Sequence, residues 1–500
     1  MGASPAVSDT SLARGAIGLR EVMFQSVAFM GCGATIVSSL PLTMAYAGGA
    51  ALDAGLLCLV ALLTVALSIS ALAAHLPSAG SFYTYASRAI HPSVGFLVGW
   101  LYSLLTVLVV PLLVLILAAT IAATHPLTSA PGLWWVYALA AIIIVSVIGW
   151  LGIKSSSIAN VILGVFELVV FLVLSIWLIF AAGDRNTLAV FGTQYANIPG
   201  HPGFGGVIAG MVFTVLAFSG FESAAPLAEE SRAPRRTIGR AVIIALLLVV
   251  GIELVSVYAA TVYFGPSKMG AFAAFSGGIG ANWEMLGGKV WGVGWILVLL
   301  AVINSCLANS NAGANTITRT LYAFGRIRVL PKALGTTDAR RKSPQVAVAV
   351  QFVLSVAITL GLGIVYGPSV AFGIIGTIIG IAFAFLYMAI NLSCFLYYWR
   401  QRRHEFRWWR HALIPAIGIL VLIPVFCAGA GIAVFSFISP LALPYSAAGP
   451  VILIWMVIGL VYLFYMRSKN PERIRDTAKV FVEESGELAF EGAVDPSPAV

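Results

Sequence analysis

Charged residues are scarce in this chain. Asp, Glu, Lys and Arg make up 9% of its 500 residues, whereas 60% are hydrophobic, and the mean hydropathy is +0.99. Soluble proteins carry about 25% charged residues. The composition therefore excludes a soluble globular domain and indicates a protein with several membrane-spanning segments.

The groups that enzymes and metal sites use are also few. The cysteines all lie in apolar segments without metal-ligand spacing, which favours buried free thiols over disulfides: Cys32, Cys58, Cys306, Cys394 and Cys427. No cluster of His, Asp or Cys falls within an apolar segment, so we expect neither an enzyme nor a cofactor or metal. The Gly-x-x-x-x-Gly-Lys-Ser/Thr pattern is absent, so ATP-driven transport is not expected. The first 20 residues lack the basic-then-apolar pattern of a cleaved secretory leader.

Twelve apolar stretches are long enough to cross a bilayer as helices, which takes about 20 residues each. They cover residues 24–47, 50–74, 92–122, 133–151, 156–182, 204–227, 240–264, 290–318, 345–366, 369–399, 412–436 and 447–466. We predict an all-α membrane protein with twelve transmembrane helices in residues 21–467. A flexible tail of residues 1–20 precedes it, and a charged tail of residues 468–500 with few aromatics, expected to be disordered, follows.

Lys and Arg are unevenly distributed among the predicted loops. Only Arg185, Lys268 and Lys289 lie in the segments after the fifth and seventh spans. The positive-inside rule then places both termini in the cytoplasm of a multi-pass cell-membrane protein. The same rule explains the basic clusters Arg235-Arg236, Arg340-Arg341-Lys342 and Arg400 through Arg410, for which nucleic acid or lipid headgroups are the alternative partners. No nucleic-acid partner is expected.

Two of the spans contain a helix-weakening interruption. The first, Gly31-Cys32-Gly33-Ala34-Thr35, has two glycines one residue apart, and Phe218-Ser219-Gly220-Phe221-Glu222 follows about 190 residues later. Broken helices persist in a bilayer only where they line a cavity or pack inside protein. Paired interruptions in two halves indicate the binding site of an inverted-repeat transporter, although glycines also serve as ordinary packing residues.

Four separated motifs occur in order along the chain. They are Gly31-x-Gly33, Pro77-Ser78-Ala79-Gly80-Ser81-Phe82-Tyr83-Thr84-Tyr85, Phe218-Ser219-Gly220-Phe221-Glu222 with Glu229-Glu230-Ser231-Arg232-Ala233-Pro234 behind it, and Arg319-x-x-Tyr322-Ala323-x-x-Arg326. In these motifs, over about residues 22–400, the chain resembles the amino acid–polyamine–organocation permeases. The resemblance implies the LeuT-type five-plus-five inverted repeat, with repeat one at 22–182, repeat two at 204–399 and two extra helices at 412–466. The chain departs from the pattern of this family at two places. Ala34-Thr35 stands where many members have a bulky aliphatic residue, and Leu216 stands where some members have an aromatic gate.

A zwitterion receptor built mostly from backbone is expected at the two interruptions. Amide groups around Gly33 to Thr35 favour a substrate carboxylate, and carbonyls near Ala217 to Ser219 suit an ammonium group. The resemblance implies the same use. Phe218 and Phe221 are candidate covers for the ligand, with core packing as the alternative. The predicted substrate-binding residues are Gly31, Cys32, Gly33, Ala34, Thr35, Ala217, Phe218, Ser219, Gly220 and Phe221.

Three carboxylates lie at apparent membrane depth, and inserting each costs about 2.5–3.5 kcal/mol. By the resemblance, Glu167 stands where proton-coupled bacterial members place a lysine facing the first interruption. An acid there can bind a proton or a cation; a permanently protonated, hydrogen-bonded Glu is the alternative. Glu222 matches an acid common in the family and is either a coupling or gating group or a fixed structural one. Glu253 has no motif around it and is interpreted as a neutral, hydrogen-bonded residue.

The predicted helix at 290–318 is unusually polar for a membrane span. Asn304, Ser305 and Asn309 are candidates to line the pathway or to form a cation site against the first helix. Ordinary hydrogen bonding between helices, at about 0.6 kcal/mol per bond, explains them equally well.

Together these features predict a secondary active transporter for an amino acid or related small amine, working by alternating access and coupled to H⁺. The alternatives are an exchanger, a Na⁺-coupled carrier and a transport-inactive nutrient sensor. Because no acidic side chain lies in the first interruption, a zwitterion is favoured over a polyamine as the substrate. Substrate identity, transport direction and oligomeric state stay open at this point.

Overall fold

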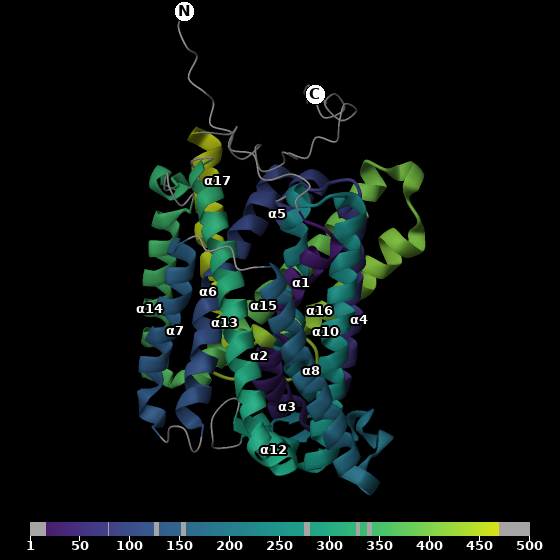
Figure 1. Cartoon of the computed structure of the whole chain (residues 1–500). Coiled ribbons are helices and arrows are strands. Elements are labelled where there is room, and N and C mark those ends of the chain that lie inside the picture. The colour runs from purple at the N-terminus through teal and green to yellow at the C-terminus, as the bar shows by residue number, and fades with distance from the viewer. Residues whose placement is uncertain are drawn as a thin grey trace, which may run out of the picture.

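The computed structural model describes residues 17–78, 80–124, 130–151, 157–274, 281–326, 331–337 and 343–469. The predicted tails, apart from residues 17–20 and 468–469, and the basic cluster Arg340-Arg341-Lys342 lie outside these ranges. The described chain forms a bundle of helices (Figure 1).

The α-helices are α1 (Leu19–Met30), α2 (Cys32–Val37), α3 (Ser39–Ala47), α4 (Ala51–Ala73), α5 (Ser81–Ala89), α6 (Pro92–Ala123), α7 (Trp134–Leu151), α8 (Ser157–Ala182), α9 (Gly203–Phe218), α10 (Pro234–Phe264), α11 (Met269–Ala273), α12 (Ala281–Trp291), α13 (Trp295–Arg326), α14 (Gln345–Tyr366), α15 (Pro368–Arg400), α16 (Ile414–Gly429) and α17 (Ala448–Lys469). The 3-10 helices used below are η1 (Gly48–Ala50), η6 (Phe221–Glu230), η8 (Gly292–Gly294) and η10 (Arg403–Glu405). A two-stranded antiparallel ribbon pairs β1 (Asn197–Ile198) with β2 (His201–Pro202).

Ten helical segments in the described residues are long and apolar enough to cross a membrane. The bent pair of α9 and the first part of η6 makes an eleventh. The remaining predicted span, 24–47, is divided into α1, α2 and α3, and α3 continues through η1 into α4. The architecture is therefore that of an all-helical, multi-span membrane protein.

Proline begins several of the long helices. α6, α10 and α15 each have Pro at their first position, namely Pro92, Pro234 and Pro368. Proline suits this position because the first helical N–H has no partner within the helix. α10 thus begins six residues before the predicted span at 240–264, since Pro234 rather than the apolar run sets its start.

One predicted span was too long at its end. The apolar run suggested a helix over 412–436, but α16 ends at Gly429. Gly431 then takes a left-handed conformation with φ 76°, which glycine adopts without steric cost and which commonly follows a helix end. The apolar residues beyond it extend the hydropathy signal without extending the helix.

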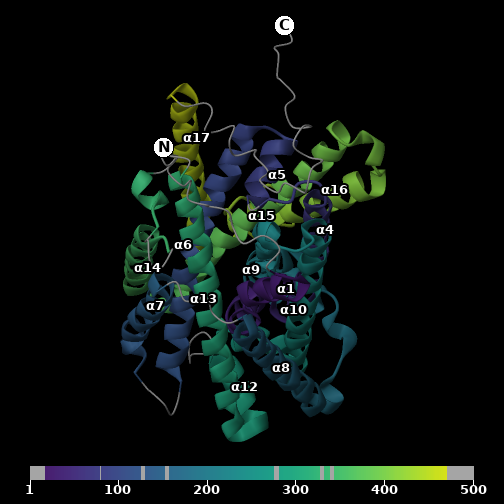
Figure 2. The same cartoon turned by 45° about the horizontal axis from the view of Figure 1, so that its top comes forward.

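The purple N-terminal helices lie inside the bundle (Figure 2). α1 packs against α8, α10, α13 and η6, and α2 contacts α8, α10 and α13. Outer helices such as α7, α8, α14 and α17 expose many large apolar side chains, as lipid-facing surfaces do. All five cysteines are free thiols. Four are buried, as predicted, whereas Cys427 is partly exposed.

The chain before α1 is joined to the segment after η6. Ile17 and Ser231 form a parallel β-bridge, and the backbone N–H of Arg232 donates to the carbonyl oxygen of Ile17 at 3.1 Å. Within α1, Ser26 Oγ donates to the carbonyl oxygen of Phe221, the first residue of η6, at 2.8 Å. The start of the first broken span is thus held against the second half of the other.

Candidate functional site

The first interruption lies at Gly31. This residue has φ 59° and ψ 59°, a left-handed conformation, and separates α1 from α2. A Cβ atom built on Gly31 would collide with Nδ2 of Asn309 in α13. Glycine is therefore required here both by the backbone conformation and by the neighbouring amide. A second break, which the sequence did not suggest, occurs at Ser38 between α2 and α3.

The second interruption lies between α9 and η6. Ser219 is extended, Gly220 has φ 111°, and the axes of the two halves differ by 40°. A Cβ atom on Gly220 would lie 3.0 Å from the backbone nitrogen of Met30. Met30 directly precedes Gly31, so the two gaps in the helices lie in contact with each other. Both gaps occur at the segments that the sequence predicts.

A cavity of about 40 Å³ lies between the two gaps. It is lined by Ala34 and Thr35 from α2, Ser219 from the second gap and Asn309 from α13, together with Ser38, Ser39 and mainly apolar side chains of α1, α6, α9 and α15. A volume of this size holds a few water molecules, so an amino acid enters only if the walls move apart. Of the predicted substrate-binding residues, Ala34, Thr35 and Ser219 line it.

The backbone amides of α2 are partly occupied. Ala34 donates its N–H to Ser305 Oγ at 3.0 Å, and Thr35 donates its N–H to the carbonyl oxygen of Gly31 at 3.0 Å. Gly33 lies against Phe171 of α8 and Ser305, each within 3.1 Å of a Cβ built on it. The predicted contact between these amides and a substrate carboxylate remains a prediction, and it would have to displace Ser305 from Ala34.

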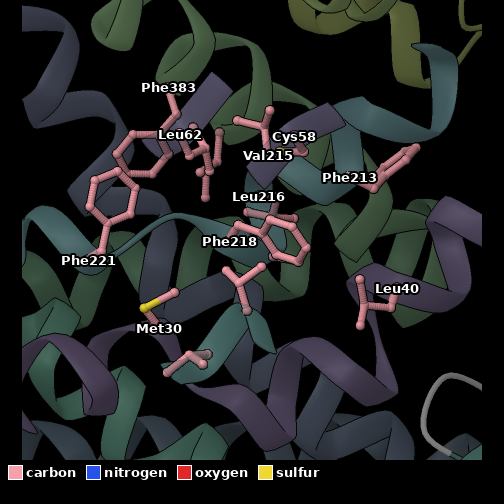
Figure 3. Close-up of a cluster of buried hydrophobic side chains, with 14 of the residues drawn as sticks. Met30, Leu40, Cys58, Leu62, Phe213, Val215, Leu216, Phe218, Phe221 and Phe383 are labelled. Atoms are coloured by element: carbon pink, nitrogen blue, oxygen red, sulfur yellow. The ribbon is translucent and has the colours of Figure 1, made fainter. Parts of the chain in front are cut away.

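The two phenylalanines of the second interruption are fully buried. Phe218 packs toward α4, where a Cβ on Gly55 would lie 3.6 Å from its ring, and Figure 3 shows it in a hydrophobic cluster that includes Cys58 and Leu62. The Phe221 ring lies 5.6 Å from that of Tyr387, centroid to centroid. Neither lines the cavity, whereas Leu216 does. A gating role for either ring stays a prediction.

Glu167 is connected to the first gap through α13. Asn304 Nδ2 donates to the buried Glu167 carboxylate at 3.4 Å, and Ser305 is the next residue of α13. Ser305 is the side chain that accepts from Ala34 N–H. The polar stretch predicted at Asn304, Ser305 and Asn309 therefore links Glu167 to the gap and lines the cavity.

Glu222 connects the second gap to α15. One of its carboxylate oxygens accepts from the backbone N–H of Gly220 at 2.9 Å and from the Tyr387 hydroxyl at 3.0 Å. The other oxygen has no partner among the described residues. The side chain fixes the chain direction at the gap, whichever of its two predicted roles it serves.

Glu253 is the residue whose position the sequence did not indicate. The Thr35 hydroxyl donates a hydrogen bond to its carboxylate from the first gap, and the other carboxylate oxygen has no partner in the described ranges. Glu253 is hydrogen-bonded, as interpreted, but it belongs to the surroundings of the site. The only sequence signal was the insertion cost of a carboxylate within an apolar helix.

Residues 22–468 match the sequence profile of the amino acid permease family. The chain belongs to this family. The permease is 26% identical over 413 residues to a low-affinity putrescine importer of Escherichia coli (strain K12), covering 81% of this chain and 83% of the relative. It is 23% identical over 436 residues to a branched-chain amino acid permease of Lactococcus lactis subsp. cremoris (strain MG1363), covering 82% and 85%. A lysine-specific permease of the same strain is 26% identical over 322 residues, covering 60% of each chain.

Family membership agrees with the chemistry of the permease site. Its relatives are transporters rather than enzymes. Because these relatives are bacterial permeases, they support a location in the cell membrane. No group of three or more His, Cys, Asp or Glu side chains in the described part of the permease is placed to hold a metal ion. The site instead offers backbone groups at two helix gaps and the side chains of Thr35, Ser219 and Asn309.

Proposed function

We propose that the protein is a secondary active transporter that moves an amino acid or related small amine across the cell membrane. It works by alternating access within a twelve-helix, five-plus-five inverted repeat whose termini both lie in the cytoplasm. The contact between Gly220 and Met30 carries the proposal, because it brings the two helix gaps together around one cavity. Relatives named for putrescine, branched-chain amino acids and lysine support the substrate class.

In this mechanism α2 and α9 each supply a half-helix end to the substrate. The last carbonyls of α9 carry the negative end of its dipole and favour an ammonium group. The cavity walls come from helices on several sides of the gaps, so moving α1, α6 or α15 opens or closes access. A cavity of about 40 Å³ is too small for an amino acid, so such a movement is needed before a substrate enters.

Proton coupling is assigned to Glu167. Asn304 donates to its carboxylate, a hydrogen bond that suits the ionised form. When the carboxyl takes up a proton it becomes a donor as well as an acceptor, which weakens its bond with Asn304 and shifts Asn304 and the adjacent Ser305. A change at Ser305 reaches the first gap directly, because Ser305 also accepts from Ala34 N–H.

A counterflow experiment tests the proposal. Purified protein in proteoliposomes, preloaded with unlabelled amino acids or amines, should accumulate the matching radiolabelled compound. An inward proton gradient without sodium should drive net accumulation. Accumulation that requires sodium and does not depend on the proton gradient would show that Na⁺, not H⁺, is the coupling ion. Strict one-for-one exchange would indicate an exchanger. Ligand binding without any flux would overturn transport in favour of a sensor.

A further inference from the structure

Asn309, one of the residues that line the cavity, has a buried side-chain acceptor that makes no hydrogen bond to the described residues. Asn309 is 6% exposed and lies in α13 directly over Gly31. The acceptor is its side-chain oxygen Oδ1. A buried polar atom without a partner is costly, so its retention needs an explanation. A ligand N–H group in the adjacent cavity supplies the missing donor.

The rest of the cavity wall is uncharged and consists of four hydroxyl side chains and otherwise apolar residues. No Asp, Glu, Lys, Arg or His side chain is among the residues that line it. Opposite the polar groups lie six large hydrophobic side chains, from α6, α9 and α15: Leu112, Leu113, Leu216, Phe372, Ile379 and Phe383. The nearby carboxylates of Glu222 and Glu253 instead accept bonds from Gly220, Tyr387 and Thr35.

We propose that the cavity takes a neutral amino acid with a short apolar side chain, and that Asn309 Oδ1 accepts a hydrogen bond from its ammonium group. This inference rests on the transport function proposed above. The ammonium lies between Asn309 and the carbonyl end of α9, and the apolar side chain contacts the hydrophobic wall. Asn309 is then a specificity-determining residue that is absent from the backbone receptor expected from the sequence.

The same wall selects against diamines and cationic amino acids. The second ammonium group of putrescine, or the side-chain ammonium of lysine, would lie against hydrophobic side chains without a carboxylate. Removing a charge from water without a partner is strongly unfavourable. The substrate class therefore differs from that named for the putrescine and lysine relatives and matches the branched-chain permease more closely.

A competition assay tests this assignment. Wild-type protein in proteoliposomes is given radiolabelled leucine, with unlabelled valine, leucine, lysine and putrescine as competitors, and direct uptake of radiolabelled lysine and putrescine is measured in parallel. Valine and leucine should compete at concentrations at least about tenfold lower than lysine or putrescine, which corresponds to about 1.4 kcal/mol. Equal or stronger competition or uptake of lysine or putrescine would overturn the inference while leaving the transport function intact. Uptake of none of these compounds would count against both.

Three variants separate a ligand contact from a structural role. Asn309→Leu should weaken leucine competition about tenfold or more. Asn309→Asp places a carboxylate in the cavity, and should shift the ratio of putrescine to leucine affinity about tenfold toward putrescine. Asn311→Leu is the matched control, because its amide oxygen also lacks a partner among the described residues but the residue does not line the cavity. Unchanged selectivity in a folded Asn309→Asp protein would contradict the proposal even if Asn309→Leu fails to fold.

Discussion

The Thr35 hydroxyl in the first helix gap donates a hydrogen bond to the Glu253 carboxylate in α10. These residues are 218 positions apart, and the bond holds a cavity-lining side chain against a helix outside the cavity. The same hydroxyl lies 3.0 Å from the carbonyl oxygen of Cys32. Glu253 therefore positions Thr35 without lining the cavity itself.

Glu253→Leu should lower the uptake rate about tenfold. A hydrogen bond between neutral groups contributes about 0.5–1.5 kcal/mol, and its loss frees Thr35 to turn. Glu253→Gln keeps an acceptor for Thr35 and should retain uptake within about twofold. Initial rates in proteoliposomes measure both variants.

A second Thr–Glu pair provides the control for this experiment. Thr124 Oγ1 donates to Glu284 Oε2 at 3.0 Å, and neither residue lines the cavity. Glu284→Leu should leave the uptake rate near that of the wild type. Equal losses in Glu253→Leu and Glu284→Leu would mean that the first loss reflects general destabilisation.

Gly220→Ala should abolish transport and lower thermal stability. Its left-handed conformation costs an alanine about 1–2 kcal/mol, and the new Cβ would lie about 3 Å from the backbone of Met30. Gly251→Ala is the matched control, since a Cβ there meets no atom within 4 Å and Gly251 lies within α10. That change should stabilise the protein by up to about 1 kcal/mol. The melting temperature and the uptake rate are measured for both variants. A fully active Gly220→Ala protein would argue against close contact of the two helix gaps.

Glu167→Gln should uncouple transport from the proton gradient. The amide cannot cycle between acid and carboxylate, so gradient-driven accumulation should be lost. Counterflow should persist within about threefold, the remaining loss reflecting the altered bond to Asn304. Glu284→Gln, which changes a buried carboxyl away from the gaps, should keep both activities. Undiminished gradient-driven accumulation in Glu167→Gln would remove this residue from the coupling mechanism.

Acidification should destabilise the loop after α4 through His75. Its ring Nε2 lies 3.0 Å from Glu405 Oε2 in η10. Burial lowers the pKa of His75 below its ordinary value of 6.5, outweighing the opposite effect of Glu405. The folded protein thus favours neutral His75. The contribution of His75 to the free energy of unfolding is therefore complete above pH 6.5, and it is lost as the pH falls through the lowered pKa of His75 in the folded protein. Between pH 7.5 and 5 the melting temperature should fall more for wild type than for His75→Gln; an identical fall would show that His75 is not involved.

The sequence predicted both helix gaps because their causes are local. Gly31, Gly33 and Gly220 weaken a helix wherever they occur, and the polar stretch around Ser305 stands out in an apolar span. The bond from Ser305 to Ala34 and the bond from Thr35 to Glu253 depend on how distant helices pack, which no local pattern encodes. For the same reason the side chains of α6 and α15 that line the cavity were not identified beforehand.

The orientation of Phe218 shows a further limit of local patterns. Its place in the second gap suggested a cover for the ligand, yet the last turn of α9 directs its ring toward Gly55 of α4. Leu216, two residues earlier, lines the cavity instead. A shift of two residues turns a helical side chain by about 200°, because each residue advances about 100°. The gap could be located from sequence, but not the rotation of the helix that leads into it.

The β-bridge between Ile17 and Ser231 restricts how the protein can open. Together with the bonds from Arg232 to Ile17 and from Ser26 to Phe221, it couples the leading part of α1 mechanically to the segment that follows α9. Tilting α1 by itself would strain both the bridge, to which the Arg232 bond belongs, and the Ser26 bond. α1 and η6 must therefore either move as one rigid unit or first break these contacts. In the second case, breaking them is a separate step on the path to the open state.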